Sequence, residues 1–115
     1  AIGEESVQRI RALKPIDPDV SLIIEGGINR PGYEKTPDIA ALYEHARTLA
    51  TEIGFDLIDL KTGGGSDGNF TASYAPTLDG MGVDGDGAHT HEERLYISSV
   101  LPRTRLLMRL METLQ

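Results

Sequence analysis

The chain contains no cysteine among its 115 residues. Disulfide bonds and thiolate metal sites are therefore excluded, and the absence fits the reducing cytoplasm that we expect as the location. Tryptophan is also absent and aromatic residues make up only 5% of the chain, so we expect an aliphatic core. A chain of this length is sufficient for one modest domain.

Basic side chains are in the minority, with 11 Lys and Arg residues against 18 Asp and Glu residues and a formal net charge of -7. A nucleic-acid-binding face needs the opposite balance, so we expect no nucleic-acid partner. Long apolar runs are missing as well, because none approaches the roughly 20 residues that span a bilayer. The sequence also shows no secretory signal, because no charged segment precedes an apolar one. We therefore expect no membrane partner.

The first part of the chain predicts a helix followed by a strand. The stretch "EESVQRIRALKPI" places Val7, Ile10 and Leu13 at helical spacing, and Pro15 ends the helix. After a turn at "DPDV", the β-branched stretch "VSLIIEG" at residues 20–26 predicts a strand. One helix and one strand cannot bury their apolar faces alone, so this unit needs a partner that the rest of the chain does not obviously supply.

From residue 36 onward helix and strand signals alternate, which favours an α/β layer architecture. The clearest helix spans about 36–54, with Thr36 as N-cap, Pro37 at its first position and Gly54 at its end. We then expect a strand over 55–62, a short helix over 67–74, a short strand over 76–82, a polar glycine-rich loop over 83–93 and a brief extended segment over 94–97.

A final helix should follow, capped by Ser98 or Ser99, with Pro102 tolerated in its first turn. Its apolar residues recur at helical spacing and are expected to form a buried stripe. The members of this stripe are Leu101, Leu106, Leu107, Leu110, Met111 and Leu114.

The stretch "TGGGSDGNF" lies between a predicted strand and a predicted helix, where open α/β sheets bind ligands. Its glycines Gly63, Gly64 and Gly65 allow a close backbone approach, and helix N-terminal amides favour an anion. Ser66 adds a hydroxyl, and Asp67 is a candidate helix cap. No lysine follows at the spacing of a P-loop. The alternative is a tight glycine-rich connection with an N-cap.

Two further segments carry groups that bind ligands. The stretch "DGDGAHTHEE" gathers His89 and His91 with carboxylates, which are good ligands for zinc-like ions. No third ligand follows at a recognised spacing, so a self-contained zinc site is not expected and a solvated polar loop is the alternative. In "NRP", Arg30 offers a guanidinium suited to bidentate carboxylate binding. The alternative there is an ordinary surface arginine.

The order of these segments is more informative than any one of them. "GGINRPGY", then after about thirty residues "TGGGSDGNF", then after about twenty "GMGVDGDGAHTHEE" and a terminal helix, resembles a known succession. It is similar to the C-terminal part of the zinc-dependent metallopeptidase family of glutamate carboxypeptidase, acetylornithine deacetylase, succinyl-diaminopimelate desuccinylase and aminoacylase. The glutamate carboxypeptidase branch is the most similar. "GGGSD" and "GxGAHxxxE" carry the resemblance, whereas "RP" alone is unspecific.

The resemblance implies a fold and a parent enzyme. Residues 28–115 would be the C-terminal part of a mixed-sheet, helix-flanked α/β catalytic domain. Residues 1–27 would be the last helix and strand of an inserted α+β lid domain, often used for homodimerisation, which would explain the unpartnered first unit. The upstream histidine-x-aspartate and paired-glutamate motifs of the family are absent, as are the histidine and asparagine of its lid. We therefore expect a fragment, inactive alone, whose partner is the missing N-terminal part of the parent.

The resemblance also implies roles for individual residues. His89 matches the C-terminal metal-ligand histidine, and Arg30 matches the arginine that clasps the carboxylate of the substrate. The backbone of Gly63, Gly64, Gly65 and Ser66 matches the loop that lines the same pocket. Glu93 matches the acidic residue that commonly follows the histidine, in a structural or ligand-supporting role, while His91 has no counterpart. No catalytic residue is assigned.

The implied cofactor is zinc, with two ions per active site in the intact parent and cobalt or manganese as alternatives. The implied substrate is a small amide that carries a free carboxylate beside the scissile bond. Two other functions stay open. One is a non-enzymatic carboxylate- or anion-binding module that uses Arg30 and the glycine loop, and the other is a degenerate family member kept for dimerisation. Because Ala1 is not a natural start, the reading frame upstream of it should discriminate among them.

Overall fold

The structure is a computed structural model and describes residues 2–114. Along this part of the chain, the elements are α1 (Ile2–Arg11), α2 (Pro37–Ile53), α3 (Gly68–Thr71), β1 (Gly85–Asp86), β2 (Arg94–Leu95) and α4 (Ile97–Thr113). β1 and β2 pair antiparallel, with Gly85 opposite Leu95 and Asp86 opposite Arg94. The described chain is therefore helix-rich with a small sheet, a partial form of the expected α/β class. Among these helices, none combines the length and the apolar character needed to cross a bilayer.

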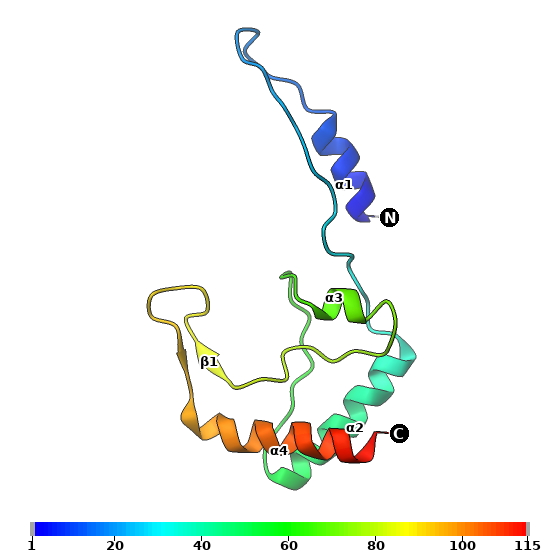
Figure 1. Cartoon of the computed structure of the whole chain (residues 1–115), viewed down its shortest axis with the longest axis vertical. Helices are drawn as coiled ribbons and strands as arrows, with labels where there is room; N and C mark the ends of the chain where they lie inside the picture. Colours follow the sequence, from blue (N-terminus) through cyan, green and yellow to red (C-terminus); the bar gives the residue numbers. More distant parts are fainter. Residues whose placement is uncertain (1, 115) are drawn as a thin grey trace.

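The described chain from residue 2 to about residue 30 projects away from the other elements (Figure 1). The chain leaves α1, turns back and runs alongside that helix, and the molecule extends over 63 × 36 × 17 Å. The Arg11 guanidinium donates a hydrogen bond of 2.7 Å to the Gly26 carbonyl, which ties the helix to the returning segment. α1 buries none of its described side chains. This unit thus packs on itself only loosely.

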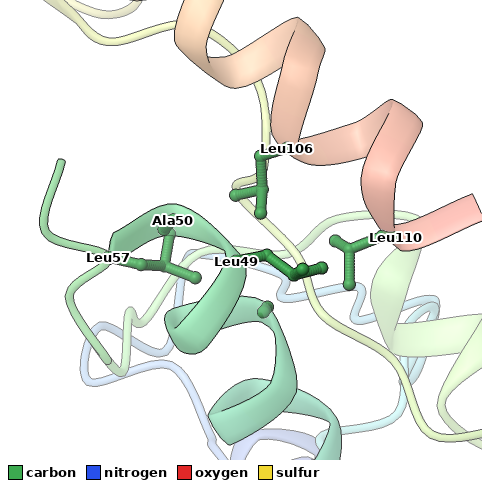
Figure 2. Packing of buried hydrophobic residues seen from close by; sticks show 6 residues of the cluster. Leu49, Ala50, Leu57, Leu106 and Leu110 are labelled. Carbon is green, nitrogen blue, oxygen red and sulfur yellow. The ribbon is translucent and has the colours of Figure 1, made fainter. Parts of the chain in front are cut away.

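The core lies where α4 crosses α2. Leu106 of α4 is fully buried, and Figure 2 shows it pointing with Leu110 toward Leu49 of α2. The remaining buried members of the cluster are Ala46, Ala50 and Leu57, and five half-buried residues pack against it: Tyr43, Ile53, Phe55, Leu78 and Met81. The core is mainly aliphatic, as the composition predicts.

The boundaries of α2 confirm the local signals in the sequence. The Thr36 hydroxyl accepts a hydrogen bond of 3.2 Å from the Ile39 amide, and Pro37 occupies the first helical position. At the other end Gly54 adopts a φ of 105°, and its amide donates to the carbonyls of Ala50 and Thr51. This left-handed conformation is the one that glycine adopts most readily.

The start of α4 differs from the prediction. Tyr96 is the N-cap, and Ser99 lies inside the helix. The Ser99 hydroxyl donates to the Tyr96 carbonyl at 2.6 Å and accepts the Asp84 amide at 2.9 Å, so it fastens a loop instead of capping. Pro102 consequently falls beyond the first turn. Of the predicted buried stripe only Leu106 and Leu110 are buried; the exposed members are Leu101, Leu107, Met111 and Leu114.

Three segments predicted as strands contain no strand within residues 2–114: 20–26, 55–62 and 76–82. A strand exists only when its backbone pairs with another, and the described chain offers these segments no such partner. Their side chains show the same lack of cover, since Ile23 is 81% exposed, Ile58 72% and Leu60 77%. The helix expected over 67–74 is shortened to Gly68–Thr71.

Two ion pairs connect residues 34–35 with residues 59–61, two segments that have no backbone pairing with each other in the described chain. The Lys61 ammonium contacts the Glu34 carboxylate at 2.8 Å, and Lys35 donates to Asp59. That hydrogen bond raises the pKa of Lys35, so the pair persists at neutral pH and is lost only as the pH rises through this raised value. The side chains are well exposed, so these pairs align the segments but contribute little free energy.

We predict that Leu106→Ala lowers the free energy of unfolding by about 2–5 kcal/mol, because it opens a cavity between α2 and α4. Urea denaturation of the chain followed by circular dichroism measures the change. Leu101→Ala is the matched control on the same helix, because its side chain is 58% exposed, and it should cost about 0.5 kcal/mol or less. Equal losses for the two variants would contradict the position of the core.

Candidate functional site

The structure brings Arg30 and the glycine loop together, although they are far apart in sequence. The Arg30 Nη2 atom lies 3.3 Å from the Asp67 carboxylate, and the guanidinium lies over the Phe70 ring at 5.5 Å. A Cβ atom on Gly65 would lie 3.3 Å from Arg30 Cδ, so the loop backbone passes close to the arginine side chain. The two predicted carboxylate-binding segments therefore form one surface.

The Arg30 guanidinium is accessible to a ligand. Its side chain is 39% exposed, and the side chain of Asp67 is 93% exposed. A single 3.3 Å contact between exposed charges is a weak ion pair. A carboxylate from solution can therefore replace Asp67 at the guanidinium without disturbing any buried group.

The three glycines differ in their surroundings. A Cβ atom on Gly63 or Gly64 would meet no atom within 4 Å, so of the three only Gly65 has a close neighbour. Within residues 2–114, no protein acceptor takes a hydrogen bond from the backbone amides of Gly63, Gly64 and Gly65. These amides thus lack a protein acceptor in the described chain, and Gly65 lies beside Arg30.

Ser66 organises the turn into α3. Its hydroxyl accepts a hydrogen bond of 3.1 Å from the Gly68 amide and donates to the Asp79 carboxylate. Its own amide donates to the Asn69 side-chain oxygen at 2.8 Å. Asp67, the predicted cap, makes no capping hydrogen bond. Ser66 and Asn69 have the i, i+3 spacing of a capping box, but Asn69 stands where that motif has Glu or Gln, so the sequence did not single out Asn69.

His89 lies in the loop that connects β1 and β2. Both Gly87 and His89 have positive φ angles, 67° and 64°. Hydrogen bonds within the loop support this conformation: the Thr90 hydroxyl donates to the Gly87 carbonyl at 2.6 Å, and the Glu93 carboxylate accepts the His89 amide at 3.3 Å. Glu93 therefore holds the backbone of the histidine.

The base of this loop is anchored on α4. Arg103, whose side chain is 14% exposed, contacts the Asp84 carboxylate at 2.5 Å and lies over the Phe55 ring at 5.2 Å. The Tyr96 amide donates to the Asp84 carbonyl at 2.8 Å. The backbone approach within the hairpin is also close, because a Cβ atom on Gly85 would lie 2.3 Å from the Arg94 carbonyl oxygen. The loop that carries His89 thus depends on the core.

The described residues do not form a complete metal site. Across residues 2–114, no three His, Cys, Asp or Glu side chains gather closely enough to hold a metal ion. Asp84 is paired with Arg103 and Asp86 with Arg94, while His89 and His91 are exposed. The described donor set therefore does not fit a closed zinc centre by itself.

The His89 loop and the Arg30 surface lie apart. In Figure 1 the loop above β1 is at one side of the molecule, whereas α3 is near its centre. No contact within the described chain joins the loop to Arg30 or to the glycine run. The third histidine, His45, serves elsewhere, since its Nε2 atom lies 2.7 Å from the Thr113 hydroxyl and joins α2 to α4.

Comparison with known proteins gives one match. The model of a family described as Peptidase family M20/M25/M40 matches residues 14–113. The matched range includes Arg30, the glycine loop and His89, as well as the α2–α4 core. No curated protein and no solved structure matches the chain.

We predict that Gly85→Ala disrupts the β1–β2 hairpin, because the new methyl group would collide with the Arg94 carbonyl. Amide hydrogen–deuterium exchange over residues 85–95 should accelerate, with a loss of about 1–3 kcal/mol in stability. Gly82→Ala is the matched control, since a Cβ atom there meets nothing within 4 Å. Exchange in Gly85→Ala that equals the control would contradict the hairpin geometry.

Proposed function

Because the chain belongs to peptidase family M20/M25/M40, we propose that it is part of a metal-dependent amidohydrolase that cleaves an amide next to a free carboxylate. Family membership supports a hydrolase, and a carboxypeptidase or deacylase similar to glutamate carboxypeptidase is our proposal for the activity. The chain would supply the carboxylate-binding surface and one metal ligand. The other ligands and the general base would come from elsewhere in the full-length protein, so the isolated chain would be inactive.

The observation that carries this proposal is the position of Arg30 beside the glycine loop. The guanidinium is exposed and weakly paired, and the amides of Gly63, Gly64 and Gly65 have no protein acceptor within the described residues. A guanidinium donates two parallel hydrogen bonds to a carboxylate, and backbone amides add further donors. Together these groups would bind the free carboxylate of the substrate and fix the position of the scissile amide.

His89 would contribute a single ligand to a zinc site that other parts of the protein complete, with cobalt or manganese as alternatives. A metal ion bound there would supply Lewis-acid chemistry at the scissile carbonyl. The described residues alone do not fit such a site, so we assign no bond-making step to them. The role of Glu93 would be to hold the histidine backbone in its positive-φ conformation.

The uncovered surfaces support the domain assignment that we propose. Residues 1–27 would end a lid domain, and residues 28–115 would close the catalytic domain. Ile16 is fully exposed and Ile23 is 81% exposed, as expected for a segment whose neighbours belong to the rest of a lid. A homodimer built through that lid would cover part of this surface. The absence of cysteine fits a cytoplasmic enzyme.

A non-enzymatic carboxylate-binding module is the second candidate. It is favoured by the same pairing of Arg30 with a free glycine loop, in a described chain that contains no complete metal site. Amide hydrolysis by the full-length protein decides between the two. If the full-length protein binds a carboxylate but hydrolyses no amide, whichever metal ion is added, the non-enzymatic module is the correct function.

We predict that Arg30→Ala in the full-length protein raises KM for a carboxylate-bearing amide by about tenfold to a hundredfold, with a smaller change in kcat. The loss corresponds to charge-assisted hydrogen bonds to the substrate. Steady-state kinetics provides the measurement. Arg47→Ala is the control, because Arg47 is an exposed arginine of α2 that pairs with Glu44 at 2.5 Å. Unchanged kinetic constants in Arg30→Ala would refute the carboxylate assignment.

We predict that His89→Ala lowers the zinc content of the full-length protein and reduces its activity by more than about a hundredfold, because a ligand is lost. Elemental analysis and an amidase assay measure the two effects. His91→Ala is the matched control, since His91 is an exposed imidazole two residues further along the same loop. Equal metal loss in the two variants would contradict the assignment to His89.

A further inference from the structure

We infer that Asn69 is a positioning residue that holds the glycine loop in register with Arg30, so that both can bind one carboxylate. The inference rests on the proposed function, because it concerns the same carboxylate-binding surface. It adds a residue whose contacts join the two segments of that surface directly.

The two ends of the Asn69 side chain contact different segments. Its oxygen accepts the Ser66 amide at 2.8 Å, at the end of the glycine loop. Its nitrogen donates to the Pro31 carbonyl at 2.8 Å, one residue after Arg30. One half-buried side chain therefore links the end of the glycine loop to Pro31, which lies 38 residues before Asn69 in the sequence.

Both of these hydrogen bonds use backbone groups, which separates them from the other contacts of the surface. The link between Arg30 and Asp67 is an ion pair, and a substrate carboxylate at the guanidinium would replace it. The contact of Arg30 with Phe70 lies over a ring that is itself exposed. The Asn69 bridge engages neither guanidinium nor loop amides of the glycine run, so it would remain intact when the ligand binds.

The bridge also fixes Ser66, because the hydroxyl of this residue is already engaged by Asp79 and by the Gly68 amide. With Ser66 held from both sides, the end of the glycine loop cannot shift relative to Pro31 without breaking a hydrogen bond. Affinity for a carboxylate benefits from such an arrangement, since donors that are already in place lose less conformational entropy on binding.

The test compares Asn69→Ala and Asn69→Leu with wild type in the full-length protein, using an amide substrate with a free carboxylate and the same substrate as its neutral methyl ester. Leucine keeps the bulk of the side chain and removes both hydrogen bonds, which guards against a result caused by a packing defect alone. Thr71→Val is the matched control in α3, because the Thr71 hydroxyl only contacts the Gly68 carbonyl and Thr77.

We expect either Asn69 variant to raise KM for the carboxylate substrate about tenfold, with kcat within about twofold and KM for the ester unchanged. Combined with Arg30→Ala, the Asn69 substitution should add less than about twofold, because it acts through the same surface. Thr71→Val should match wild type.

An equal rise in KM for acid and ester, or full additivity with Arg30→Ala, would overturn the inference in favour of a purely structural role. No change in the Asn69 variants while Arg30→Ala raises KM would overturn the inference and leave the proposed function in place. No change in Arg30→Ala itself would refute the proposed function, and the role of Asn69 with it.

Discussion

The packing of α4 across α2 through Leu106 is the contact on which the rest of the structure depends. Leu106 is fully buried, and it packs in one cluster with residues of α2 and with Leu57. α2 follows directly on the segment that carries Arg30, and Leu57 of the same core leads into the glycine loop. The N-terminal half of α4 holds the His89 loop through Ser99 and Arg103. Loss of this core would therefore displace both segments together.

Electrostatics acts differently at the two segments. Arg103 is mostly buried, so its contacts with Asp84 and Phe55 are shielded from solvent and act structurally. Arg30 is more exposed, and its Asp67 partner is almost completely solvated, so that pair is easily exchanged. The two arginines thus differ in burial and in how firmly each is paired. In a chain with a net charge of -7, an exposed and weakly paired guanidinium is a favourable position for an anionic ligand.

Prediction from the sequence succeeded where the signal is local. The bounds of α2 follow from Thr36, Pro37 and Gly54, whose effects need no distant partner. The strands predicted over 20–26, 55–62 and 76–82 did not form. A strand needs a second segment to pair with, and the described chain gives these segments no such partner. The cap of α4 failed because the Ser99 hydroxyl serves the Asp84 amide, a contact 15 residues away that no local pattern contains. Hydrophobic periodicity likewise could not predict that Arg30 approaches the glycine loop. Only the order of the motifs suggested it.

The exposed apolar side chains and the incomplete site have one physical explanation under the proposed function. Met111 is 74% exposed on α4, and Ile58 and Leu60 are exposed on an extended segment without a backbone partner in the described chain. Burying such residues stabilises a protein by about 1.5–3 kcal/mol each, so under the proposed function we expect a further layer of the full-length protein to cover them. If that layer completes the site, this chain needs to supply only some of its ligands. Under the proposed function the chain would supply one guanidinium on a hydrogen-bonded loop and one imidazole on an anchored hairpin, and a further layer would bring the remaining ligands to the surface between them.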